Sequence, residues 1–300
     1  MTFWYRIEHR TNYQYAQPVA CCQNQLRMLP RNFDVPWVKV VCRDVDLRVD
    51  PTPDFTHHHN DYYGNRVVSF SIETPHDALS LKVTSEVCVK PNLSIDALTG
   101  DNWTVVYDRI QKRIDPNWLE VREYLFDSEN VSRGEEFRQY AQSSFLPGRC
   151  IVDACRELTY RLHDDLRYDV SATSVETTPE EAFSIRAGVC QDFAQIQIAC
   201  LRSLGIAARY VSGYLRTHAP PGKKRLVGAD QSHAWVSVYM GPELGWVDLD
   251  PTNRCETNGE HVPICIGRDY AEVTPMRGVV IGGGSPTLSV TVDVCEIDPQ

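Results

Sequence analysis

The chain has 300 residues, of which 42% are hydrophobic and 23% are charged, and its formal net charge is −10 at pH 7. This acidic balance provides no overall basic field, which argues against nucleic acid as a partner. No stretch is apolar for long enough to span a bilayer, and the first ten residues lack the apolar run and cleavage site of a leader, so we expect a cytoplasmic protein without a membrane partner.

The first part of the chain carries the alternation of apolar and polar side chains that is typical of half-buried strands. The alternating stretches are residues 3–10, 38–42, 45–49, 67–72 and 79–89. Turn residues at 51–54 and 63–66 separate them. Several short strands at this spacing predict an antiparallel sandwich-like domain.

Three successive histidines, His57, His58 and His59, stand within this part. Neighbouring side chains of an extended segment point to opposite faces, so the three rings cannot converge on one metal ion. We interpret them as a polar loop before residues 60–64 and predict no metal site there.

Eleven cysteines are scattered along the chain, an odd number without the spacing of a disulfide framework. We therefore expect free thiols. Cys42, Cys88 and Cys200 alternate with valine or leucine and are interpreted as small core residues. The adjacent Cys21 and Cys22 have no second pair at the spacing of a zinc site.

Asparagine and glycine residues between positions 91 and 108 mark a boundary between two parts of the chain. Beyond it, apolar residues recur every three or four positions, as in helices. The predicted elements of this part are helices over 116–125, 133–141, 150–163 and 178–183 and an extended stretch over 166–170. The last of these helices has a Thr-Pro-Glu-Glu start, which combines a capping residue, proline in the first turn and acidic residues.

Residues 188–206 hold a glycine, a cysteine and an amphipathic run closed by a second glycine. This pattern predicts that Cys190 lies in the first turn of a buried helix. Unpaired backbone N–H groups and the helix dipole stabilise negative charge at that position, which favours a nucleophilic thiolate. Asp192 is interpreted as a stabiliser of the same first turn.

A strand predicted over 207–216 is followed by a loop over 218–225, whose basic tripeptide we interpret as solvated. Strands over 230–239 and 246–250 then flank a Gly-Pro turn, which predicts an antiparallel hairpin.

A nucleophilic cysteine needs a base, and the base needs a partner that fixes its tautomer. The predicted hairpin supplies His233 at the start of one strand and Asp250 at the end of the next. Asp248 lies on the same face as Asp250, because side chains alternate with period two. Geometry inferred from the sequence does not separate the two aspartates.

Three motifs occur in order: Gly-Val-Cys-Gln-Asp-Phe at 188–193, Ser-His-Ala-Trp-Val at 232–236 and Gly-Trp-Val-Asp-Leu-Asp-Pro-Thr at 245–252. Together they resemble the transglutaminase-like cysteine enzymes of the papain-like fold. In that family the aspartate before Pro-Thr completes the triad, so the resemblance selects Asp250, with Asp248 as the runner-up. Residues 1–90 and the tail at 267–278 resemble the flanking regions of bacterial members.

The resemblance implies an α+β protein in which the helix that carries the cysteine packs on an antiparallel sheet, after a sandwich-like N-terminal domain that we expect to wall the cleft. The implied divisions are a β-rich N-terminal domain over 1–95, a helical connector over 96–148, a catalytic core over 149–260 and a C-terminal extension over 261–300 whose strands pack on the N-terminal domain.

The implied chemistry is acyl transfer at a peptide or protein amide, and a peptidase or amidase is the preferred function. The alternatives are a protein-glutamine gamma-glutamyltransferase, which cross-links proteins, and a non-catalytic interaction module with a vestigial site. The backbone N–H of Cys190 is expected to contribute to an oxyanion hole. Ser184 stands where a papain-type glutamine would lie, and Tyr168 and Gln191 are candidates for the second donor.

No cofactor or metal is expected, because the chain has no acidic loop of the EF-hand kind. The sequence is compatible with a homo-oligomer.

Overall fold

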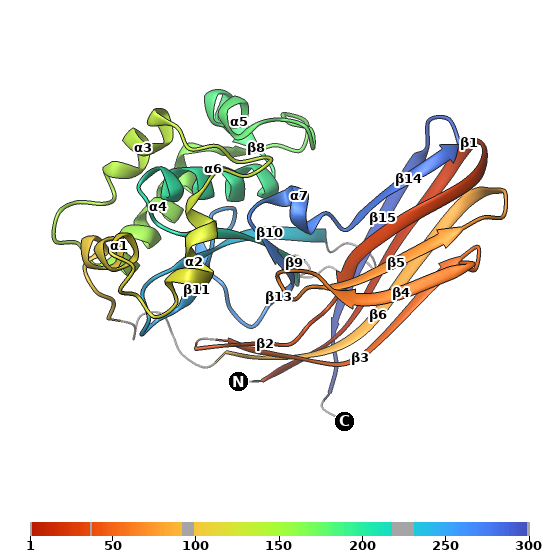
Figure 1. The fold of residues 1–300 in the computed structure, drawn as a ribbon, viewed down its shortest axis with the longest axis horizontal. Helices are drawn as coiled ribbons and strands as arrows, with labels where there is room; N and C mark the ends of the chain where they lie inside the picture. The colour runs from red at the N-terminus through yellow and green to blue at the C-terminus, as the bar shows by residue number, and fades with distance from the viewer. Residues whose placement is uncertain (1, 37, 92–98, 218–230, 299–300) are drawn as a thin grey trace, which may run out of the picture.

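The computed structural model describes residues 2–36, 38–91, 99–217 and 231–298. A large antiparallel sheet forms one part of the molecule, and helices surrounding a second antiparallel sheet form the other (Figure 1). The expected loop at 218–225 lies outside the described residues. No helix of the described residues is long and apolar enough to cross a membrane. The eleven cysteines all lie within the described ranges, and all are free thiols.

The large sheet has eight strands: six lie in the order β2-β3-β6-β1-β5-β4, and the other two, β14 and β15, pair with β1. Its strands are β1 (Phe3–Leu29), β2 (Phe33–Val35), β3 (Val38–Asp50), β4 (Phe55–Asn60), β5 (Arg66–Ile72), β6 (His76–Pro91), β14 (Met276–Gly282) and β15 (Thr287–Glu296). Strands from the two ends of the chain therefore share one sheet.

Strand β1 connects two groups of strands. Its first part, up to Gln14, pairs with β6 and β15, and its second part, from Val19, pairs with β5 and β14. The pairing register shifts between these two residues. Apolar side chains of β5 and β6 pack with those of the second part of β1 in one buried cluster, which gives this region its sandwich-like form.

Two interpretations of the N-terminal sequence are wrong. His57, His58 and His59 belong to the edge strand β4, because pairing with β5 supplies the backbone hydrogen bonds that a loop would lack, and all three side chains are exposed. Cys88 is only half-buried, because Val87 and Val89 take the core side of β6 and alternation turns the thiol to the outer face. Cys42 is also only half-buried on β3, whereas Cys200 is buried.

The helical part begins earlier than predicted, with α1 (Trp103–Gln111) inside the expected boundary. The side chain of Asn102 accepts a hydrogen bond from the backbone N–H of Thr104 and caps this helix. The β-branched run Thr-Val-Val weakened the helical signal in the sequence. The remaining helices before the cysteine are α2 (Trp118–Val121), η2 (Arg122–Leu125), α3 (Glu135–Gln142), α4 (Ile151–Asp165) and α5 (Pro179–Ile185).

The second sheet has five antiparallel strands in the order β12-β11-β10-β9-β13. They are β9 (Ala208–Leu215), β10 (Gln231–Tyr239), β11 (Trp246–Asp250), β12 (Cys255–Glu256) and β13 (His261–Gly267). Strand β13 falls within the stretch expected as the C-terminal extension, yet it pairs with β9 in this sheet. The short helix α7 (Tyr270–Val273) then leads to β14 and β15 on the large sheet.

Helix α6 (Cys190–Ser203) lies at the centre of the helical part, packed on β9 and β10 and covered by α3, α4 and α5. Two of its buried polar side chains, Gln197 and Arg202, donate hydrogen bonds to neighbouring elements. Gln197 donates to the hydroxyl of Thr159 at 2.8 Å, and the Arg202 guanidinium donates to the carbonyl oxygen atoms of Tyr124 and Ala208. These contacts fix the helix that carries Cys190.

Candidate active site

Cys190 is the first residue of α6. It directly follows β8 (Ala187–Gly188) and the cap residue Val189, and β8 pairs in parallel with β7 (Arg167–Tyr168). A carboxylate oxygen of Asp192 accepts hydrogen bonds from the backbone N–H of Val189 and from the Thr173 hydroxyl, both at 2.7 Å. Asp192 therefore stabilises the first turn, as expected from the sequence.

Gly188 lies against that same carboxylate. A Cβ atom at residue 188 would meet Oδ2 of Asp192 at 2.4 Å, so a larger residue would displace the carboxylate that caps the helix. The glycine two residues before the cysteine thus preserves the position of the nucleophile.

The structure brings Cys190, His233 and Asp250 together. His233 Nε2 lies 2.7 Å from Asp250 Oδ2, and the His233 side chain also forms a hydrogen bond with Cys190. Because Nε2 faces the carboxylate, Nδ1 is the ring nitrogen left to exchange a proton with the thiol. His233 is 9% exposed and Asp250 is fully buried, so the pair lies in a low-dielectric environment at the base of the cleft.

The carboxylate of Asp250 accepts hydrogen bonds on both oxygen atoms. Its Oδ1 accepts the backbone N–H groups of Thr252 and Asn253 at 2.9 and 3.1 Å. Its Oδ2 accepts the side-chain amide of Asn253 at 2.7 Å, in addition to His233. The loop that follows β11 therefore folds back to hold this carboxylate in place.

A second buried histidine, His261 on β13, also contacts Asp250. Its Nε2 lies 3.0 Å from Asp250 Oδ2, and its Nδ1 lies 3.3 Å from both the backbone nitrogen and the side-chain oxygen of Asn258. Because an ionised carboxylate only accepts hydrogen bonds, Nε2 is the donor to Asp250. No sequence motif indicates His261, because it stands outside the three motifs and only the pairing of β13 with β9 brings it to the site.

Asp248, the runner-up, has a different partner. The indole N–H of Trp235 donates to Asp248 Oδ2 at 3.0 Å, and burial raises the pKa of this carboxyl. The Trp235 ring packs against the rings of both His233 and His261. Asp248 therefore supports the tryptophan beneath the histidines, while Asp250 contacts His233 directly.

His233 and Asp250 each stabilise the charged form of the other. Burial opposes protonation of His233, but its hydrogen bonds to Asp250 and Cys190 outweigh burial and raise its pKa above the ordinary value for histidine. Burial would raise the pKa of Asp250, but its hydrogen bonds to the two histidines hold it well below its usual range. An ionised carboxylate beside a protonated imidazole is the arrangement that stabilises a thiolate.

The same groups form the candidate metal cluster of the described residues. The ligand atoms of His233, Asp250 and His261 lie within 4.8 Å of one another. Both imidazole Nε2 atoms lie within hydrogen-bond distance of one carboxylate oxygen, which is the geometry of proton-mediated contacts. A metal ion at this position would replace those contacts and occupy the ring nitrogen that His233 uses to contact Asp250.

The two candidates for the second oxyanion donor lie on different sides of the thiol. Tyr168 lines a hollow of about 320 Å³ together with Cys190, His233 and Asn253. Burial and the neighbouring Cys190 raise the pKa of the Tyr168 phenol, so it remains a protonated donor at neutral pH. The Gln191 side chain points toward the carbonyl oxygen of Val175, 3.5 Å away. Tyr168 thus shares a hollow with Cys190 and His233, whereas the amide of Gln191 is directed toward Val175.

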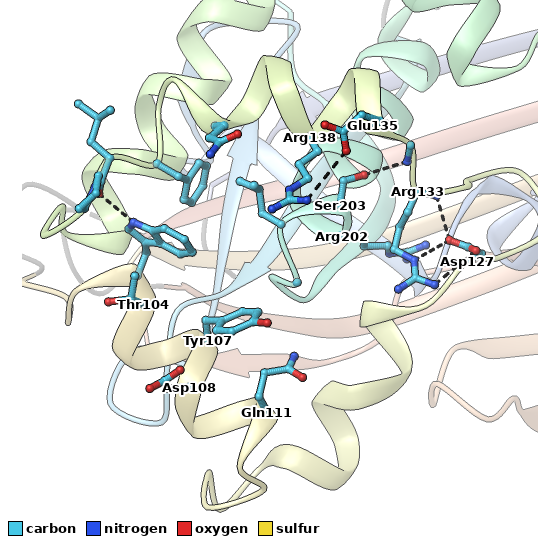
Figure 2. A pocket seen from close by; sticks show the side chains of 18 residues that line it. Thr104, Tyr107, Asp108, Gln111, Asp127, Arg133, Glu135, Arg138, Arg202 and Ser203 are labelled. Atoms are coloured by element: carbon cyan, nitrogen blue, oxygen red, sulfur yellow. Dashed lines mark hydrogen bonds and ion pairs between the residues drawn. The ribbon is translucent and has the colours of Figure 1, made fainter.

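A larger cavity of about 1050 Å³ lies near the other end of α6, between α1 and α3 (Figure 2). Among its charged groups, Arg133 pairs with Asp127 and Arg138 with Glu135, as Figure 2 shows. Its described lining contains no cysteine or histidine. Ser203 lies about 20 Å from Cys190 along the helix axis, so this cavity is separate from the candidate active site.

A cysteine at the start of a helix that packs on an antiparallel sheet bearing a histidine and an aspartate defines the papain-like class of folds. Models of two families match the chain: the bacterial transglutaminase-like N-terminal region over residues 5–88 and the transglutaminase-like superfamily over residues 139–251. The chain belongs to the transglutaminase-like superfamily, and the resemblance drawn from the sequence motifs is confirmed.

Several relatives extend over nearly the whole chain. Uncharacterized protein Rv2569c of Mycobacterium tuberculosis is 36% identical over 297 residues, which cover 98% of this chain and 93% of that protein. Uncharacterized protein ML0607 of Mycobacterium leprae is 29% identical over 97% of this chain and 98% of its own length. The crystal structure of a candidate cysteine protease from Cytophaga hutchinsonii covers 100% of this chain and 92% of its own, with a TM-score of 0.75 and 19% identity, which confirms the fold.

A third relative matches over a shorter stretch. The protein-glutamine gamma-glutamyltransferase of Pseudomonas aeruginosa is 37% identical over 93 residues, which are 30% of this chain and 14% of that protein.

The contribution of Asp250 to stability should depend on pH. A raised pKa of His233 stabilises the folded state fully below about pH 6.5 and progressively less as the pH rises, and a lowered pKa of Asp250 stabilises it above about pH 4. We expect Asp250→Asn to lower the free energy of unfolding by about 3 kcal/mol at pH 5.5 and by less at pH 9, as measured by urea denaturation. A difference that stays constant or grows toward pH 9 would contradict the assignment. The control Asp34→Asn, in an exposed ion pair with Lys39, should change stability by less than about 0.5 kcal/mol at either pH.

His261 should support the reactivity of the thiol through Asp250. His261→Phe keeps an aromatic ring beside Trp235 but removes the donor to the carboxylate, so we expect alkylation of Cys190 by iodoacetamide at pH 7 to slow several-fold. His261→Gln, which retains a side-chain N–H donor, should recover part of the rate. His76→Phe changes a buried histidine of the large sheet and serves as the control. Equal alkylation rates in His261→Phe and the wild type would show that His261 only packs.

Proposed function

We propose that this protein is a cysteine-dependent amide acyl-transfer enzyme, and specifically a peptidase or amidase acting on a peptide or protein amide. The observation that carries the proposal is the line from Cys190, at the start of a buried helix, through His233 to the buried carboxylate of Asp250. A structural role alone gives no reason to bury an ionised pair behind a half-exposed thiol, because desolvation of such a pair is costly.

In the proposed reaction the sulfur of Cys190 attacks the amide carbon and forms a C–S bond. The protonated His233 gives its proton to the departing amine as the C–N bond breaks, and Asp250 orients the ring throughout. Water then attacks the thioester and gives a proton to His233, and the C–S bond breaks to release the acid, which restores the Cys190 thiolate beside the protonated His233. The backbone N–H of Cys190 stabilises the oxyanion. The reaction transfers an acyl group and protons and therefore requires no cofactor.

A second candidate function is protein cross-linking, in which an amine resolves the thioester in place of water. The 93-residue match to the protein-glutamine gamma-glutamyltransferase of Pseudomonas aeruginosa favours this alternative. Hydrolysis and cross-linking share the step that forms the acyl-enzyme. They differ in whether water or an amine reaches the thioester. We propose the cytoplasm as the location, which the eleven free thiols support.

Labelling of the thiols tests the proposal at Cys190. We expect iodoacetamide to modify Cys190 faster than the half-buried Cys88 and at lower pH, with each site followed by peptide mass spectrometry. His233→Gln should abolish this advantage. A Cys190 that reacts no faster than Cys88 in the wild type would support the non-catalytic alternative, an interaction module with a vestigial site.

A glutamine peptide supplied with a primary amine distinguishes hydrolysis from cross-linking. Release of ammonia without incorporation of the amine is the expected result. Incorporation that outruns hydrolysis would replace our preferred function with transamidation.

Matched substitutions test the second oxyanion donor. Tyr168→Phe removes only the hydroxyl group of a residue that lines the same hollow as the thiol, so we expect kcat to fall on the order of 100-fold with little change in KM. Gln191→Ala should lower kcat far less, since its amide is directed toward Val175. The reverse order of the two effects would assign the donor to Gln191.

A further inference from the structure

A second hollow opens at the thiol, on the side that faces the large sheet. Its volume is about 310 Å³, and both parts of the molecule line it. The core contributes Cys190, Tyr210 and Tyr270, and the large sheet contributes Tyr13, Leu288 and Val290. We call this hollow the inter-sheet groove.

The residues of β15 that line the groove belong to an apolar face of this strand, and the rest of that face packs against the core. Side chains alternate along a strand, so Leu288, Val290, Val292 and Val294 share one face. Val292 and Val294 are buried where β15 contacts β10 of the core (Figure 1), whereas Leu288 and Val290 are 52% and 48% exposed. The apolar face thus extends beyond the packed contact and becomes uncovered where it reaches the groove.

Strand β1 widens this wall. Tyr13 pairs directly with Leu288, and Thr11 pairs with Val290, so their side chains are neighbours on one face of the sheet. The next residue on this face, His9, is buried and forms hydrogen bonds with the hydroxyl groups of Tyr214 and Thr11. Burial lowers the pKa of His9 to about 4, so this histidine is neutral at pH 7.

The described lining of the groove contains no aspartate, glutamate, lysine or arginine. His233 also lines the groove but is already hydrogen-bonded to Asp250 and Cys190, so a charged side chain entering the groove would lose its hydration without gaining a free ionic partner, which is unfavourable. An apolar or aromatic side chain would cover Leu288 and Val290 and gain the hydrophobic term.

We infer that the inter-sheet groove is the specificity subsite of the enzyme and that it binds an uncharged apolar or aromatic side chain of the peptide substrate, next to the amide that Cys190 attacks. This inference rests on the proposed acyl-transfer function. The volume of the groove suits one large side chain with its adjoining backbone, at the lower end of the range of ligand pockets. Selectivity thus comes from the N-terminal and C-terminal strands, while the catalytic groups come from the core.

A library of internally quenched peptides tests the subsite, with the residues on each side of the scissile amide varied in turn. At one of the two positions we expect phenylalanine or leucine to exceed aspartate and lysine by at least tenfold in kcat/KM. Val290→Asp, a change at a half-exposed side chain, should lower the value for the apolar substrates by about tenfold and shift the preference toward lysine. Leu288→Asn is a second variant of the same wall and should weaken the apolar preference in the same direction.

The control is Ile281→Asp on β14, which places the same charge on an apolar strand residue that is 59% exposed and does not line the groove. It should keep the wild-type preference.

Two failures can be told apart by alkylating Cys190 of the wild-type protein in parallel. Rapid alkylation and turnover without an apolar preference, or with a preference that Val290→Asp and Leu288→Asn leave unchanged, would overturn the subsite and leave the proposed function standing. Slow alkylation at Cys190 and no turnover of any peptide would overturn both.

Discussion

The buried carboxylate of Asp250 is the constraint on which the candidate site depends. An ionised group without solvent needs hydrogen-bond donors, and here they come from the backbone and side chain of the following loop, from His233 on β10 and from His261 on β13. Strands β10, β11 and β13 and the loop after β11 therefore all contribute to the surroundings of one carboxylate. The orientation of His233 follows from this arrangement, because its Nε2 must face the carboxylate and its Nδ1 is then directed away from it.

The nucleophile is held by a separate set of contacts. Helix α6 is buried along most of its length, and Asp192 fixes its first turn, so Cys190 is presented from a rigid element. The base and its partner come from the core sheet, and one wall of the proposed specificity groove comes from β1 and β15 of the large sheet. In the proposed enzyme this wall can vary without disturbing the catalytic geometry.

Much of the fold could be predicted from local patterns, and the errors have a common physical origin. The alternation along β6 and the capped start of α5 are local signals, and both elements form as expected. His57, His58 and His59 were interpreted as a loop because their polarity is a local property, whereas pairing with β5 is not. The start of α1 was missed because β-branched residues follow its cap.

Three features could be predicted without the structure, since each follows from neighbouring residues and their spacing. They are the family, the order of cysteine, histidine and aspartate along the chain, and the placement of Cys190 at the start of a helix. The contacts that distinguish Asp250 from Asp248 come from the tertiary structure, because both residues lie on one strand and differ in which side chain reaches them. The tertiary structure also decided the contribution of His261 and of the wall at Leu288 and Val290. These residues come from strands distant in sequence, and they meet the site only through sheet pairing, which side-chain patterns do not encode.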